Sequence, residues 1–224
     1  MRRIGITAVS VLVVALALAG SALAAPGGGS ASGWHLGYYT ASGRTLSNAG
    51  VPSTPPGLAS FNFTSQDNTA LLVTDQSAQN PTLLGDLTGK SVSASFTITG
   101  LTGTFTYYGE PDACGGTTAY VRYYFETSNA GGFDETHYWW SNPVSMTLTG
   151  NGSVTLPAVQ LTGANWSDFY GHFGNDPVYS AGFNAAVSNV TRIGLSFGGG
   201  CFFENGVGTT DGSGTFTLNT YSVN

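Results

Sequence analysis

A short strand-like segment, residues 119–126, carries side chains that could do chemistry. Polar or aromatic residues alternate there with apolar ones, so they would project from one face of a β-strand. That face carries Tyr120, Arg122, Tyr124 and Glu126. Tyrosine rings can stack on sugars, and an arginine offers several donors to hydroxyl groups. The pattern predicts a shallow ligand-binding face, and it is also compatible with a surface Arg122–Glu126 ion pair beside tyrosines that cover the sheet.

A second aromatic segment follows at Tyr138-Trp139-Trp140. Neighbouring side chains of a strand point to opposite faces, so we expect one tryptophan in the core and the other on the outside. His137 and Trp139 have the same parity, and we predict that they extend the face that carries Tyr124. Rings lining a groove would favour neutral sugars, whereas a flat apolar patch would favour a protein partner.

The acidic residues give little support to catalysis. Glycoside hydrolysis needs two carboxylates on either side of one sugar-sized gap. Most acidic residues lie beside Gly, Pro, Asn or Thr in predicted turns, where a carboxylate usually caps backbone N–H groups. Glu126 ends a predicted strand, but neither Glu135 nor Glu204 stands at a recognisable spacing from it. No Gly-x-Ser-x-Gly elbow is present. The sequence favours binding and leaves a hydrolase, or a lyase using the 119–126 face, open.

The N-terminus has the three parts of a secretory signal peptide. Basic Met1-Arg2-Arg3 precedes an apolar run over residues 4–19 and the cleavage signal Ala22-Leu23-Ala24. The run is shorter than the about 20 apolar residues that span a bilayer, although a retained anchor is the alternative. We predict a signal peptide over residues 1–24, a flexible Gly/Ser linker over 25–33 and one secreted, extracellular domain over 34–224.

Two cysteines, Cys114 and Cys201, lie in glycine-rich segments. An exported protein meets an oxidising environment, so one disulfide between them is predicted, with two free thiols as the alternative. A zinc site needs closely spaced ligands, which two distant cysteines and three histidines do not provide.

The charge excludes several partners. The formal net charge is −6, and it becomes −8 once Arg2 and Arg3 are removed with the signal peptide. Nucleic acid and, after cleavage, anionic membrane surfaces are therefore poor partners. Charged residues make up 8% of the chain, so Ser, Thr, Asn, Gly and Tyr must cover most of the surface. Such a surface suits neutral, hydroxylated ligands, and the composition leaves the oligomeric state open.

Short strand patterns separated by turn residues run through the domain. Residues 91–99 alternate strictly between apolar and hydroxyl side chains, which predicts one buried and one wet face. Further strands are predicted over 58–63, 69–74, 136–140, 144–148, 153–156, 190–197 and 215–223, with one short helix over 183–189. This pattern predicts an all-β fold, a single jelly-roll β-sandwich domain.

Three segments resemble galactose-binding-like jelly rolls, which include many carbohydrate-binding modules, and are similar to laminin IV type A domains. They are Gly85-Asp86-Leu87-Thr88-Gly89-Lys90 before the alternating strand, Gly152-Ser153-Val154-Thr155-Leu156-Pro157, and the run from Val187 to Leu195 that contains Asn189-Val190-Thr191. The resemblance covers residues 58–223.

The resemblance implies a galactose-binding-like β-sandwich that acts as a secreted, non-catalytic module for neutral glycan or cell-envelope polysaccharide. It implies no cofactor apart from a structural calcium ion, for which Asp67, Asp86 and Asp211 are possible ligands. An extracellular structural or adhesive protein with protein partners is the alternative, beside a polysaccharide-active hydrolase or lyase. Fold alone does not give function, so the function has to be inferred from the residues of the site.

Overall fold

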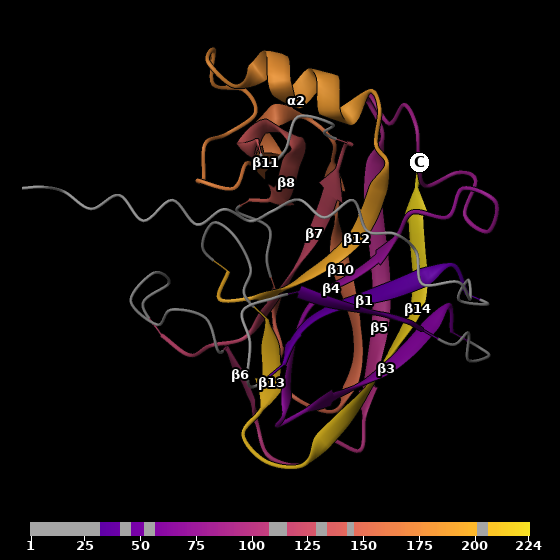
Figure 1. The fold of residues 1–224 in the computed structure, drawn as a ribbon, viewed down its shortest axis with the longest axis vertical. Helices are drawn as coiled ribbons and strands as arrows, with labels where there is room; N and C mark the ends of the chain where they lie inside the picture. The colour runs from indigo at the N-terminus through magenta and orange to yellow at the C-terminus, as the bar shows by residue number, and fades with distance from the viewer. Residues whose placement is uncertain are drawn as a thin grey trace, which may run out of the picture.

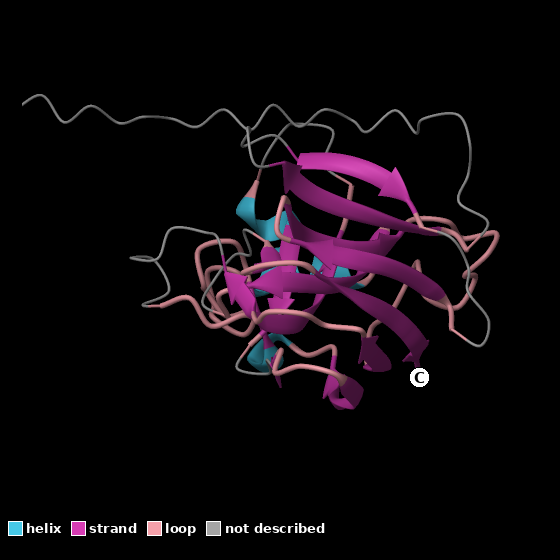
Figure 2. Ribbon diagram, turned by 90° about the horizontal axis from the view of Figure 1, so that it is seen from below, coloured by secondary structure: helices cyan, strands magenta, loops and turns pink. Residues whose placement is uncertain are grey.

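Two antiparallel β-sheets form a β-sandwich (Figure 1). The computed structural model describes residues 32–40, 46–51, 57–107, 116–128, 134–142, 146–200 and 206–224. Strands dominate these residues, and the helices are confined to short segments (Figure 2). The described part is therefore mostly β, as the period-2 segments and Gly-rich turns predict.

The larger sheet has ten strands, and its main path runs β11-β8-β7-β12-β4-β1-β2. The bounds of these strands are β11 (Trp166–Ser167), β8 (Tyr138–Ser141), β7 (Tyr120–Glu126), β12 (Arg192–Gly198), β4 (Asp67–Thr74), β1 (Trp34–Thr40) and β2 (Leu46–Gly50). Three short strands join beside this path, namely β6 (Phe105–Tyr107), β9 (Met146–Thr147) and β13 (Val207–Thr209). Because β7 lies between β8 and β12, its outward side chains meet those of both neighbours.

The smaller sheet has four strands in the order β10-β5-β14-β3. Their bounds are β10 (Gly152–Gln160), β5 (Ser91–Thr99), β14 (Ser213–Val223) and β3 (Ala59–Thr64). The apolar residues of β5 are buried and its hydroxyl residues are half-buried or exposed, which confirms the alternation predicted for residues 91–99.

The core lies between the two sheets and is rich in aromatic rings. Val121, Tyr123 and Phe125 of β7 all lie in it, so the apolar set of this strand faces inward as the alternation predicts. Phe216 of the smaller sheet packs 5.5 Å from Phe197 of the larger sheet, measured between ring centroids. Aromatic pairs of this kind stabilise the contact between the two layers.

The helix α2 (Ser180–Val187) lies at one end of the sandwich, at the top of Figure 1. It buries Phe183, whose ring lies 5.0 Å from Trp139. The short helix predicted over 183–189 is therefore present, although it begins at Ser180. Among the described residues, no helix is long and apolar enough to cross a membrane.

Several sequence predictions fall outside or beside these elements. The predicted signal peptide, residues 1–24, lies outside the described residues and stays a prediction. The patterns do not predict β1 and β2, yet the first residue of β1, Trp34, is fully buried and packs 5.3 Å from Tyr221. The 3-10 helix η1 (Glu135–His137) replaces the beginning of the strand predicted over 136–140.

Candidate functional site

An aromatic cluster lies on the outer face of the larger sheet, on the side away from the sandwich core. Tyr124 of β7 pairs with Trp140 of β8, and their ring centroids are 5.1 Å apart. Val73 of β4 completes this cluster, which is separate from the main core. The Trp140 indole N–H donates a hydrogen bond to the Ser196 hydroxyl over 3.0 Å. Tyr124 and Trp140 are only 2% and 6% exposed, so their rings are not free to stack on a ligand.

The prediction that Trp139 shares the face of Tyr124 is wrong. Trp139 is fully buried in the main core, and its indole N–H donates to the backbone carbonyl of Thr136 over 2.7 Å. His137 lies on η1, before β8 begins, with Nδ1 3.4 Å from the Asp134 carboxylate. Trp140 takes the outward position, because the register of β8 against β7 sets the parity and the sequence does not reveal that register.

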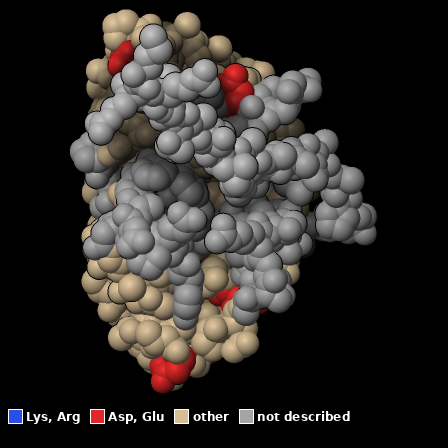
Figure 3. All heavy atoms as spheres, turned by 60° about the vertical axis from the view of Figure 1, so that its left-hand side comes forward, with Lys and Arg blue, Asp and Glu red and all other residues tan. Residues whose placement is uncertain are grey.

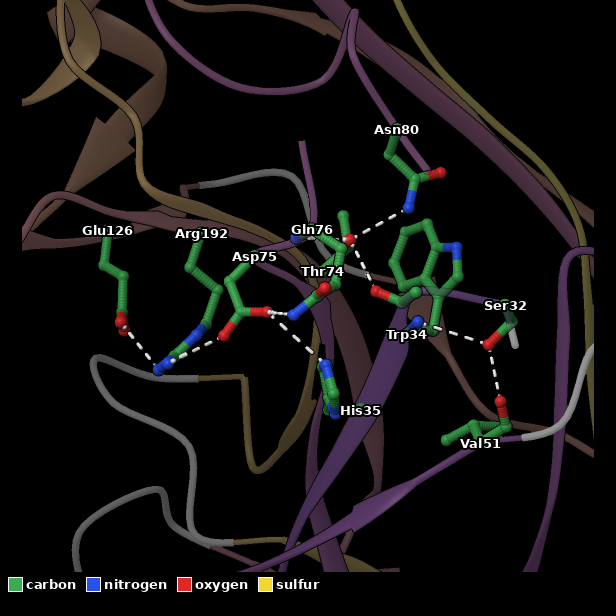
Figure 4. A network of polar contacts seen from close by, with 11 residues as sticks. Ser32, Trp34, His35, Val51, Thr74, Asp75, Gln76, Asn80, Glu126 and Arg192 are labelled. Carbon is green, nitrogen blue, oxygen red and sulfur yellow. Dashed lines mark hydrogen bonds and ion pairs between the residues drawn. The ribbon is translucent and has the colours of Figure 1, made fainter. Parts of the chain in front are cut away.

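A chain of polar contacts crosses the same outer face beside the aromatic cluster (Figure 4). The Tyr124 hydroxyl donates to Glu126. Arg192 Nη1 donates to Glu126 over 2.7 Å, and its Nη2 lies 3.4 Å from Asp75. His35 Nε2 lies 3.4 Å from the same Asp75 carboxylate. Strands β7, β12 and β1 and the residue that follows β4 therefore contribute to one network.

The ion pair that the sequence offered, Arg122–Glu126, is not the one that forms. Glu126 pairs with Arg192 because the register places these residues opposite each other on β7 and β12. Arg122 is 1% exposed and donates to the Ser141 carbonyl over 3.5 Å. Tyr120, the first residue of β7, is half-buried. The four residues named from β7 therefore occupy very different environments.

Burial and charge shift the pKa values of this network in opposite directions. Burial raises the pKa of the Glu126 carboxyl, and the Arg192 charge only partly offsets it. Partial burial also acts upward on the pKa of Asp75, but the Gln76 hydrogen bond and the Arg192 charge outweigh it and lower that pKa. Burial raises the pKa of Tyr124 well above its ordinary value, so this phenol remains a neutral donor.

The exposed aromatic rings lie next to this face, in the segment that joins β11 to α2. In the described part of the chain, the exposed large hydrophobic residues are Tyr170 at 58%, Phe173 at 37% and Val178 at 78%. Phe169 connects them to the sheet, since its ring lies 6.3 Å from Trp140 and 5.2 Å from Tyr170. We call residues 168–173 the aromatic loop.

A buried carboxylate fixes the shape of the aromatic loop. The Asp168 side chain is fully buried and accepts hydrogen bonds from the backbone N–H groups of Tyr170 and His172, both over 2.9 Å. The Nδ1 atom of His172 lies 3.0 Å from the other carboxylate oxygen. The Tyr179 ring stacks on the His172 ring with 4.1 Å between their centroids, which also fixes the orientation of His172. Tyr170 is therefore exposed but held on an ordered turn.

Sequence reasoning missed the aromatic loop, although a signal was present. Asp168 and Gly171 bracket two aromatic residues, and Gly171 adopts a φ of 88°, which glycine tolerates better than other residues. Asp followed by Gly within a few residues is a turn pattern. Two aromatic residues inside such a turn have few neighbours to bury them.

Other predicted sites remain predictions. Cys114, Cys201 and Glu204 lie outside the described residues, and nothing is described of the Glu135 side chain. In the described ranges, no three His, Cys, Asp or Glu residues gather as a metal site would require. Of the possible calcium ligands, Asp86 accepts a hydrogen bond from the Thr88 backbone N–H over 3.0 Å, as a turn-capping carboxylate does.

Comparisons with known proteins do not assign this chain to a family. No protein-family model, no curated protein and no solved structure matches the chain.

Proposed function

We propose that this protein is a secreted, non-catalytic module that binds a neutral glycan through the aromatic loop. The observation that carries the proposal is the Tyr170 ring, 58% exposed on a turn that the buried Asp168 carboxylate holds in place. The proposal includes secretion and the galactose-binding-like jelly-roll topology that the sequence motifs imply.

An ordered, exposed aromatic ring is better explained by binding than by stability. Surface residues of this kind add little to the free energy of folding. A ring that is already held in position loses less conformational entropy when a ligand arrives, which improves affinity. Sugar-binding sites combine such rings with nearby polar groups, and here the half-exposed His172 borders Tyr170 at 6.1 Å between ring centroids.

The charge of the surface supports a neutral ligand. On the face drawn in Figure 3, the described side chains are mainly uncharged, with isolated acidic groups. The chain as a whole carries 12 acidic and 6 basic residues. An acidic polysaccharide would therefore be repelled, while a neutral one meets no such penalty.

The test compares two neighbouring substitutions. Tyr170→Ala should weaken binding of neutral oligosaccharides at least about tenfold, which corresponds to about 1.4 kcal/mol. Val178→Ala is the matched control, because Val178 is more exposed than Tyr170 yet has no ring to stack on a sugar. Glycan-array screening identifies the oligosaccharide, and calorimetry on the purified protein measures the affinities, with the melting temperature as folding control.

The outcome separates the proposal from its rivals. If Val178→Ala weakens oligosaccharide binding as much as Tyr170→Ala, the exposed hydrophobic residues act together as an apolar surface and not through ring stacking. Such a surface is what an adhesive protein would need to dock a protein partner. Asp168→Ala should weaken glycan binding as well, because the loop loses three hydrogen bonds that position Tyr170. Unchanged glycan affinity in both Tyr170→Ala and Asp168→Ala contradicts the proposal.

A polysaccharide hydrolase is the second candidate, and the raised pKa of Glu126 is what favours it. A general acid needs a carboxyl group that holds its proton to higher pH, which is the direction of this shift. However, Arg192 contacts both Glu126 and Asp75 and so fills the gap in which a glycosidic bond would have to lie. We expect no hydrolysis that depends on Glu126. Polysaccharide degradation that Glu126→Gln abolishes, with the fold intact, would support the enzyme instead.

A further inference from the structure

The outer face of the smaller sheet carries mainly hydroxyl and amide side chains. None of its strands β10, β5, β14 and β3 contains Asp, Glu, Lys, Arg or His. The outward positions are filled mainly by Ser and Thr, represented by Ser93, Ser95, Thr97, Thr155, Thr217 and Thr220. We call this surface the hydroxyl face.

The hydroxyl groups of this face stand in rows across the strands. Ser153, Thr97, Thr217 and Ser60 occupy paired positions on β10, β5, β14 and β3. Neighbouring strands are spaced about 4.8 Å apart, so such a row repeats at that interval. Cross-strand hydrogen bonds fix the side chains, as between Ser95 and Thr220 over 2.7 Å and between Thr97 and Ser153 over 2.9 Å.

The chemistry of the hydroxyl face selects a neutral, hydroxylated partner. A hydroxyl can donate and accept, so each paired group keeps capacity for one more partner. With no charge on the four strands, a charged ligand finds no counter-charge, and the water on the face is easier to displace than water held by ions. The hydroxyl groups of a neutral sugar can replace those waters one for one.

Because each single hydrogen bond on this face is weak, the partner must make many of them at once. A neutral hydrogen bond contributes only about 0.5–1.5 kcal/mol after water is replaced, so a short oligosaccharide would hardly be retained. A rigid surface that offers many hydroxyl groups at once adds these contacts at high effective concentration. A face without projecting charged or aromatic side chains fits such a surface.

We propose that the hydroxyl face lies against the surface of an insoluble neutral polysaccharide. It is a second contact, separate from the aromatic loop. The inference takes its substrate class from the proposed function but does not depend on Tyr170, so the two can fail independently.

The test places charges on the hydroxyl face. Thr155 and Thr220 are exposed and belong to one row, in which Ser95 of β5 pairs with both. The double variants Thr155→Lys/Thr220→Lys and Thr155→Glu/Thr220→Glu should both reduce retention on microcrystalline cellulose and insoluble chitin at least tenfold. Ser77→Lys/Gln79→Lys is the control, because both residues are exposed on the loop after β4. A calcium pectate gel, which is acidic, should not retain the wild-type protein.

The outcomes are decisive for this surface. Equal retention of the charged pairs and the control, or no retention of the wild type on either neutral particle, overturns the inference. A wild-type dimer that both charged pairs dissociate would show that a second copy covers the face, which also overturns it. Binding of soluble oligosaccharide should be unchanged in the charged pairs and weakened at least about tenfold in Tyr170→Ala, so that each site is tested by its own ligand.

Discussion

Arg192 lies between two carboxylates, 2.7 Å from Glu126 and 3.4 Å from Asp75. Its side chain is 20% exposed and that of Glu126 is 14% exposed, so water screens this pair only partly. A shielded ion pair adds little net stability, yet removing one partner leaves the other charge uncompensated. Arg192 therefore matters chiefly because it keeps two neighbouring acids compatible with the folded state.

Replacing Arg192 by glutamine should destabilise the protein in a pH-dependent way. At pH 8 we expect a loss of about 3 kcal/mol in the free energy of unfolding, as for other broken buried pairs. Without the guanidinium, the folded-state pKa of Glu126, which burial already raises, rises further, and that of Asp75 rises from its lowered value. An acid with a raised folded-state pKa favours folding below its unfolded pKa, and this contribution is lost as the pH rises. The loss should therefore be smaller at pH 4, as urea unfolding at both pH values measures.

A conservative substitution separates the charge of Arg192 from its packing. Arg192→Lys keeps a positive charge beside both carboxylates and should lose less stability at pH 8 than Arg192→Gln. If Arg192→Gln loses the same amount at pH 4 and pH 8, the aliphatic part of the side chain is what matters and the electrostatic explanation is wrong.

At the scale of strands, alternation along one segment predicts well which side chains face the core. It does not predict which segments pair or in which register. Residues 91–99 and the inward set Val121, Tyr123 and Phe125 follow from period 2 alone. The partner of Glu126 does not follow, because Arg192 comes 66 residues later and meets it through the register of β12. The register of β14 against β5 also shifts at a bulge after Leu218, and no local sequence pattern in β14 predicts that shift.

The choice between Trp139 and Trp140 shows the same limit, and it can be tested. Trp139→Ala should lower the free energy of unfolding by about 3–5 kcal/mol, because a large buried ring in contact with Phe183 leaves a cavity. Tyr170→Ala should cost about 0.5 kcal/mol or less, because that ring is mostly in solvent. Thermal and urea unfolding measure both. A small loss for Trp139→Ala would mean that β8 presents the opposite face to the core.

At the scale of the whole molecule, the two outer faces differ in chemistry. The ionisable network of His35, Asp75, Glu126 and Arg192 lies on the larger sheet, and the smaller sheet carries uncharged hydroxyl groups. Composition predicts a low-charge surface, but it does not predict this separation, because the sequence does not state which strands share a sheet. The aromatic loop escapes prediction for a similar reason, since exposure depends on what the rest of the fold leaves uncovered.

The predicted disulfide between Cys114 and Cys201 would join two segments that are far apart in the sequence. The described residues that flank the cysteines support it: Tyr107 pairs with Val207, and Tyr120 pairs with Gly198. Cys114 stands between the first residues of these pairs in the sequence, and Cys201 stands between the second. The described residues on either side of the two cysteine-bearing segments thus pair with each other, and this pairing is the reason to test for the bond.

Non-reducing peptide mapping should therefore recover one cross-linked peptide that contains both cysteines. The bond closes a loop of 88 residues, from position 114 to position 201. The double variant Cys114→Ala/Cys201→Ala should therefore lose up to about 4–5 kcal/mol in the free energy of unfolding by the chain-entropy account. Each single variant should lose as much, because either change prevents the bond. Two titratable thiols per chain in the untreated protein, or a double variant as stable as the wild type, would show that paired strands alone hold these segments together.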